Sequence, residues 1–251
     1  MANNKKIVCK ILEFILHKYP LVNALTLLLL FAERAATNTD TPIHPRIVYA
    51  NLLGFLGCAL FMSSHIKRKE AALVFCGQLI YFAYNFYNNN KLHYKEWLRQ
   101  EMCSRQVGCI GVYLLFAHII DHKKSNLLRR LGEILLGIFM FAYVYLLNDS
   151  REIRRAFLSH MVGDDWARYV VAMVIAACAL CFLSGYFVRD MALCAAVTIA
   201  TLTLVIDCDF TYWSLKGVQF WNQGRMVADN LCICTGLLYA FFHVDNRVKM
   251  D

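Results

Sequence analysis

Ionisable side chains beside long apolar stretches are the first candidates for chemistry in this chain. Glu33 and Arg34 close the first such stretch, and Asp207 and Asp209 close a later one. A charge in hydrocarbon costs at least ~2.5–3.5 kcal/mol, so each of these groups needs a partner, water or a functional reason to be there. Because Glu33 and Arg34 are adjacent, they point to different faces of a helix and need separate partners.

The two aspartates near the end of this later stretch have several possible roles. Asp207 and Asp209 could accept protons, bind a cation, or pair with Arg34 or Arg225. Two carboxylates act together in acid–base or cation chemistry only if both face one cavity. Residues two apart in a helix do not share a face, so a helical segment here predicts separate roles.

Aromatic and amide side chains complete a candidate polar cluster. Tryptophan is typical of the membrane–water interface, and amides can cap helices or bond across them. These residues either contact a substrate or a lipid head group, or they are interfacial anchors satisfied by water, which is the simpler interpretation. The candidate cluster comprises Glu33, Arg34, Asp207, Asp209, Trp213, Trp221, Asn222 and Gln223.

Catalytic and cofactor motifs are absent from the sequence. It contains no HExxH, no GxSxG, no phosphate-binding loop and no Gly-rich dinucleotide turn. Cys178 and Cys181 have CxxC spacing, but a zinc site needs a second pair, or histidines at ligand spacing, in a wet loop. We therefore expect buried thiols, no enzyme activity, no cofactor and no metal.

The elements that must position these residues are long apolar helices. Hydrophobic residues make up 59% of the 251 residues, charged residues make up 18%, and the mean hydropathy is +0.45. Soluble domains are nearer 45–50% apolar and about 25% charged. Most of the blocks lack a polar face repeating every 3.6 residues. The predicted fold class is all-α: a polytopic membrane protein with about eight transmembrane helices. The predicted spans are 20–36, 47–64, 71–87, 107–120, 128–147, 167–188, 191–207 and 228–243.

Residues 1–19 predict an amphipathic helix that lies in the membrane interface. Lys6, Lys10, Glu13 and His17 recur on one helical face, opposite an apolar face. Pro20 would then open the first span, where its missing N–H costs nothing. The alternative is one long helix that is kinked at Pro20.

The order of features suggests that the chain is duplicated. Both halves show a span, a basic–acidic step, a second span, a polar loop, a tryptophan and a further span. We predict two parallel four-helix repeats, 20–121 and 122–251. At an offset of 120, Tyr49, Cys58, Ala59, Leu60, Ser64, Ala72 and Leu73 match Tyr169, Cys178, Ala179, Leu180, Ser184, Ala192 and Leu193. At an offset of 124, Trp97, Met102 and Leu114 match Trp221, Met226 and Leu238.

The net charge of +8 comes from short basic runs at the ends of apolar blocks. Such runs are typical of cytoplasmic loops and of contact with anionic membrane lipid, and we expect no nucleic-acid partner. The shortest loops favour cytoplasmic N- and C-termini, which places the sequon at Asn148 in the lumen or outside. We expect an integral membrane protein of the secretory pathway or the plasma membrane.

Six short segments spread over most of the chain carry a resemblance to a known family. They are Phe31-Ala32-Glu33-Arg34-Ala35, Phe61-Met62-Ser63, Phe182-Leu183-Ser184-Gly185-Tyr186, Leu204-Val205-Ile206-Asp207, Tyr212-Trp213 and Phe220-Trp221-Asn222-Gln223. In these segments the chain resembles the transmembrane protein 101 family. This resemblance implies a multi-pass membrane protein of unknown biochemical activity that promotes NF-κB and MAPK signalling, with signalling proteins as possible partners.

A second likeness concerns the fold. The segments Leu180 to Arg189, Leu204–Asp207 and Tyr212-Trp213 are similar to the DoxX-like four-helix membrane module, and the same outline in the first half would fit a tandem of two such modules.

The predicted duplication and the polar groups suggest an alternative function. The chain would then be a transporter or receptor for a lipid, a small hydrophobic molecule or a cargo, with its site between the two repeats. That hypothesis requires Glu33, Arg34, Asp207 and Asn222 to converge on one cavity.

Overall fold

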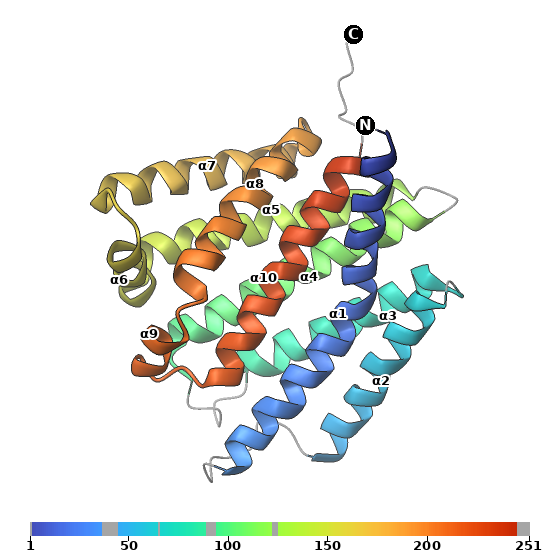
Figure 1. The fold of residues 1–251 in the computed structure, drawn as a ribbon, viewed down its shortest axis with the longest axis horizontal. Coiled ribbons are helices and arrows are strands. Elements are labelled where there is room, and N and C mark those ends of the chain that lie inside the picture. The colour runs from blue at the N-terminus through green and yellow to red at the C-terminus, as the bar shows by residue number, and fades with distance from the viewer. Residues whose placement is uncertain (1, 37–44, 65, 89–93, 122–124, 245–251) are drawn as a thin grey trace.

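The computed structural model describes residues 2–36, 45–64, 66–88, 94–121 and 125–244, which form ten α-helices and one π-helical turn without any strand (Figure 1). The prediction of an all-α fold is confirmed. The helices are α1 (Ala2–Ala36), α2 (Pro45–Ser63), α3 (Arg68–Asn88), α4 (Glu96–Ile120), α5 (Asn126–Asp149), α6 (Arg151–His160), α7 (Asp164–Ser184), α8 (Val188–Leu202), α9 (Phe210–Leu215) and α10 (Phe220–His243), and the π-helical turn Thr203–Asp207 follows α8.

Seven helical segments in the described part of the chain are long and apolar enough to cross a membrane. They are α1, α2, α4, α5, α7, α10 and the continuous segment Val188–Asp207. The remaining predicted span, 71–87, lies in α3, which has 21 residues but is less apolar than these seven segments. The protein is thus an integral, multi-pass membrane protein, as its composition predicts.

The distribution of side chains is the reverse of that in a soluble protein. Leu53, Val197 and Leu204 are exposed by more than half, whereas Arg105 and Asn230 are at most 1% exposed. Water would favour the opposite arrangement, but lipid favours apolar side chains outside and polar side chains paired inside. The surface and the core therefore both indicate a lipid environment.

Two central helices, α4 and α10, cross each other and organise the bundle. α1 and α8 pack against α10, while α3 and α5 pack against α4. The pair α2–α3 and the pair α7–α8 lie on opposite sides of this central group (Figure 1). In the predicted two-repeat arrangement, the first helix of each repeat (α1 or α5) would pack against the last helix of the other repeat (α10 or α4). The boundary between the repeats, at residues 121 and 122, stays a prediction.

The turns before α3 and α8 have the same backbone geometry. Lys67 has φ +48° and Phe187 has φ +53°, and both are non-glycine residues in the left-handed region. The amide of Ala71 bonds to the carbonyl of Lys67, and the amide of Met191 bonds to that of Phe187. These positions differ by 120, the offset of the sequence matches, so they support the predicted duplication.

α1 continues without a break through Pro20, which is the alternative to an interfacial helix followed by a separate span. Proline lacks the N–H that would bond to the carbonyl of Leu16, four residues earlier. Tyr113 of α4 supplies the missing donor, because its hydroxyl lies 2.6 Å from the oxygen of Leu16. The long helix is therefore stabilised by a side chain from the centre of the bundle.

For two of the spans, the predicted first residue lies several residues after the start of the observed helix. The spans 107–120 and 228–243 start after the charged residues, whereas α4 begins at Glu96 and α10 at Phe220. The prediction placed Arg105 and Arg225 in loops because a charge facing lipid is costly. Both side chains instead point into the bundle, where they are almost wholly buried.

Candidate functional site

The two central helices each carry an acid and a base one helical turn apart. On α4 these residues are Glu101 and Arg105, and on α10 they are Arg225 and Asp229. Residues four apart lie on the same helical face. None of the four is more than 6% exposed. Ionisable groups inside spanning helices mark functional sites by default, so these residues define the candidate site.

Arg105 joins α4 to the end of the π-helical turn. Its Nη2 lies 2.6 Å from Glu101 Oε1 and 3.1 Å from Asp207 Oδ2. Asp207 Oδ2 also accepts a hydrogen bond from Asn230 Nδ2 at 2.8 Å. The backbone oxygen of Asp207 accepts one from Gln223 Nε2 at 2.7 Å. Residues of both α4 and α10 therefore fix the position of Asp207.

The π-helical turn explains why Asp207 reaches the interior. The amide of Cys208 bonds to the first carbonyl of the turn at 2.9 Å, which makes the turn one residue wider than an α-helical turn. Such turns change the direction of the following side chains and often occur at functional sites. Trp213 covers the turn, with its Nε1 donating to the oxygen of Ile206 at 3.0 Å.

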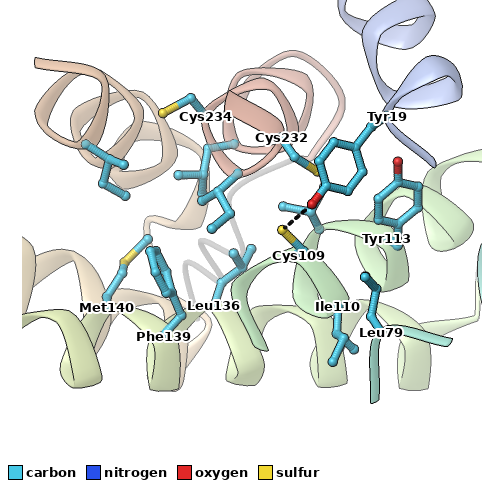
Figure 2. Packing of buried hydrophobic residues seen from close by; sticks show 14 of the residues in the cluster. Tyr19, Leu79, Cys109, Ile110, Tyr113, Leu136, Phe139, Met140, Cys232 and Cys234 are labelled. Atoms are coloured by element: carbon cyan, nitrogen blue, oxygen red, sulfur yellow. Dashed lines mark hydrogen bonds between the residues drawn. The ribbon is translucent and has the colours of Figure 1, made fainter. Parts of the chain in front are cut away.

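Asp229 forms a second polar centre that connects α1, α4 and α10. Its Oδ2 accepts a hydrogen bond from Gln106 Nε2 at 2.7 Å, and its Oδ1 accepts one from the hydroxyl of Tyr19. That hydroxyl also lies 3.5 Å from Cys109 Sγ (Figure 2). We call the residues of the two centres, together with the buried Arg225 one helical turn before Asp229, the charge network: Tyr19, Glu101, Arg105, Gln106, Asp207, Gln223, Arg225, Asp229 and Asn230.

Part of the charge network has counterparts 124 residues apart along the chain, with the charges reversed on the two central helices. Tyr19 of α1 corresponds to Tyr143 of α5 at an offset of 124. On the central helices, an acid of one occupies the position of a base on the other. At the same offset, Glu101, Arg105 and Gln106 correspond to Arg225, Asp229 and Asn230.

The network has more acids than bases. If all its groups were ionised, Glu101, Asp207 and Asp229 would carry one more charge than Arg105 and Arg225 neutralise. An uncompensated charge inside hydrocarbon costs at least ~2.5 kcal/mol. One bound proton would remove this imbalance.

Glu101 is the carboxylate best placed to hold that proton. Its Oε1 binds Arg105, whereas its Oε2 is buried without a hydrogen-bond partner among the described residues. Glu101 also lines a small cavity with Tyr143, Asp207 and Trp213. The volume in which the centre of a water molecule could lie is about 10 Å³, which is close to the minimum for a cavity that holds one water.

The chemistry around these carboxylates favours a proton over a metal ion. Their neighbours are guanidinium, amide and phenol groups, which donate hydrogen bonds. Hard metal cations instead need several oxygen ligands. Within the described residues, no group of three or more His, Cys, Asp or Glu could hold a metal ion.

Glu33 and Arg34, two members of the predicted cluster, bind the start of α10. The carboxylate of Glu33 accepts hydrogen bonds from the amides of Phe220 and Trp221 at 3.1 and 3.2 Å, which satisfies two of the free N–H groups at that helix end. Arg34 Nε donates to Gln219 Oε1 at 3.1 Å. The two adjacent residues therefore have separate partners.

The predicted cluster does not form one site. Asn222 is wholly buried in the first turn of α10, and the Trp213 ring lies 5.7 Å from that of Trp97. Of the four residues that the inter-repeat hypothesis needs, Asp207 alone lines the described cavity. Asp207 and Gln223 belong to the charge network, and Trp213 covers it. Four members lie at the start of α10 or contact it: Glu33, Arg34, Trp221 and Asn222. Asp209 caps α9.

Asp209 and His160 form a pH-sensitive link between α9 and α6. Asp209 Oδ1 caps the amide of Tyr212 at 2.9 Å, and its Oδ2 lies 3.0 Å from His160 Nε2. His160 Nδ1 lies 2.8 Å from the oxygen of Ala156, so both ring nitrogens can donate when the ring is protonated. The hydrogen bond to Asp209 raises the pKa of His160 above 6.5, and it lowers the pKa of Asp209 below 3.8.

We expect the link between α6 and α9 to weaken in alkaline solution. The contribution of His160 is fully present below pH 6.5 and is lost as the pH rises through its raised pKa, whereas that of Asp209 is lost only in strong acid. Hydrogen exchange of the α6 amides should therefore accelerate between neutral and alkaline pH, beyond the intrinsic rate change. In Asp209→Asn this acceleration should be absent, and an unchanged profile in that variant would contradict the assignment.

Most of the charge network was not predicted from the sequence. The predicted candidates lie at the ends of apolar stretches, whereas the unpredicted residues lie inside helices of the bundle: Tyr19, Glu101, Arg105, Gln106, Asp229 and Asn230. One available signal was the acid–base spacing of four residues, repeated at an offset of 124. That spacing predicts a shared helical face at equivalent positions of both halves.

A sequence model described as the TMEM101 protein family matches residues 2–241 of the chain. The match covers all spanning helices nearly to the end of α10, and it includes the whole charge network. No solved structure matches the fold.

Proposed function

We propose, from the premise that this chain belongs to the TMEM101 protein family, that it is a membrane transporter in which Glu101 carries an exchangeable proton. The observation that carries the proposal is that the charge network contains one more carboxylate than guanidinium groups, all of them buried. A proton neutralises this excess in the interior of the bundle, and its loss would make an arrangement with access to water more favourable.

The location of the charge network supports this proposal. The charge network lies where α4 and α10 cross. Each of these helices is the last spanning helix of one predicted repeat. In transporters built from repeats, coupling ions bind near the middle of the membrane between the repeats, which move against each other. The contacts of Arg105 with Asp207 and of Gln106 with Asp229 both join the first half to the second.

Proton flux in reconstituted vesicles tests the proposal. Under an inward-negative potassium diffusion potential, vesicles containing the wild-type chain should acidify inside faster than protein-free vesicles. Glu101→Gln should lower this rate at least ~10-fold, the size typical of a lost proton-transfer group. The matched control is Glu96→Gln, an exposed carboxylate on the same helix, which should retain the wild-type rate.

Each variant must be monodisperse and as thermally stable as the wild type for the comparison to count. Equal flux in Glu101→Gln and the wild type would contradict the assignment of Glu101. A wild-type rate equal to that of protein-free vesicles would contradict proton transport itself.

Promotion of NF-κB and MAPK signalling is the second proposed function, and membership of the family is the observation that favours it. The two proposals make different demands on Glu101. In knockout cells, Glu101→Gln should restore a stimulated NF-κB reporter as well as the wild type does if signalling depends on a docking surface. It should fail to do so if signalling depends on proton transport. A knockout with normal reporter output would contradict a signalling role.

A further inference from the structure

An apolar groove on the membrane-facing side of the first half lies between α2 and α3. It has a volume of about 280 Å³ and is separate from the charge network. Gly57 keeps it open, because a Cβ atom at this position would have no atom within 4 Å. The apolar part of the wall is formed by Gly54, Gly57, Cys58, Phe61, Ala71 and Val74.

One end of the groove carries a base and an acid. Lys67 and Glu70 line it near the turn between α2 and α3, and both also border the polar hollow at the ends of the helices. Among the described residues neither side chain has an ion-pair partner. A positive and a negative group thus stand together where an apolar groove meets a polar hollow.

The neighbouring bases are engaged within the protein. Arg68 Nη1 lies 2.6 Å from Glu13 Oε1, and Lys69 Nζ lies 2.8 Å from Asp121 Oδ2. Among the three consecutive bases at 67–69, Lys67 is therefore the one available to bind a ligand. The equivalent position of the second half is Phe187, which has the same left-handed backbone but no charge.

From this geometry we propose that the groove binds one glycerophospholipid with an ethanolamine head group. An acyl chain occupies the apolar wall between α2 and α3. Lys67 binds the phosphate, and Glu70 accepts a hydrogen bond from the terminal ammonium group. A lipid of this class matches both charges at the mouth, whereas a glycerol head group would offer Glu70 neutral hydroxyl donors but no positive charge.

Native mass spectrometry of the purified full-length chain tests this proposal. With phosphatidylethanolamine added to the detergent solution, the wild type should retain one lipid molecule at energies that remove the detergent. Gly57→Leu should fill the groove and reduce the retained fraction at least fivefold. Gly77→Leu is the matched control, because position 77 on α3 also has open space but does not line the groove.

Two further arms distinguish the head-group contacts. Lys67→Gln should weaken retention of every phospholipid, since all of them carry the phosphate. Glu70→Gln should remove the preference for phosphatidylethanolamine over phosphatidylglycerol and phosphatidylcholine. Equal retention in Gly57→Leu and Gly77→Leu, or a wild type without preference among the three lipids, would overturn the proposal.

Discussion

Replacing Arg105 by glutamine is expected to lower the free energy of unfolding by about 3–5 kcal/mol, the cost of removing one partner from a buried ion pair. Arg105 is 1% exposed and contacts both Glu101 and Asp207. Its loss leaves the Asp207 carboxylate beside the protonated Glu101 without a cation to compensate its charge. Reversible unfolding in mixed micelles, or thermal unfolding in one mild detergent, would measure the change.

A double variant separates the charge from the shape of the side chain. Adding Asp207→Asn to Arg105→Gln removes the uncompensated carboxylate and should recover part of the lost stability. Arg99→Gln is the matched control: it lies on the same helix but is partly exposed, and it should change stability by less than about 1 kcal/mol. A loss in Arg105→Gln no larger than that of the control would contradict a buried ion pair.

The second large effect is expected where α4 and α5 cross. A Cβ atom at Gly111 would lie 3.0 Å from the backbone oxygen of Gly132, and one at Gly132 would lie 2.9 Å from that of Gly111. Backbone atoms cannot move aside as a flexible side chain can. Gly132→Val should therefore destabilise the protein by about 1–3 kcal/mol or more, and Gly111→Val by a similar amount.

Gly77→Val controls for the general cost of placing a β-branched residue in a helix. A Cβ atom at position 77 would have no atom within 4 Å, so this substitution should change stability by less than about 1 kcal/mol. Melting temperatures of the three variants in the same detergent would test the ranking. Similar losses at positions 77 and 132 would show that α4 and α5 do not approach closely at Gly111 and Gly132.

The existence of the spanning helices could be predicted because lipid imposes a simple rule. A chain in hydrocarbon must satisfy its backbone within helices, so long apolar blocks become helices irrespective of the details of their sequence. The short helices α6 and α9 were not predicted. α6 is polar, and α9 depends on the cap that Asp209 provides for Tyr212.

The charged part of the site was harder to predict because burial inside a bundle depends on neighbours. Asp207 was identified from its position at the end of a span, but its partners Arg105 and Asn230 come from other helices. Hydropathy cannot tell a charge that faces lipid from one that faces another helix. The helix starts at Glu96 and Phe220 were missed for the same reason.

Infrared spectroscopy of the protein in lipid tests the central claim most directly, because a protonated carboxyl in an apolar site has its own absorption band. We expect one such band near neutral pH, which is lost in Glu101→Gln and kept in Glu96→Gln. In the wild type this band should decrease as the pH is raised. Its absence at every pH, or its persistence unchanged in Glu101→Gln, would contradict a proton held by the charge network.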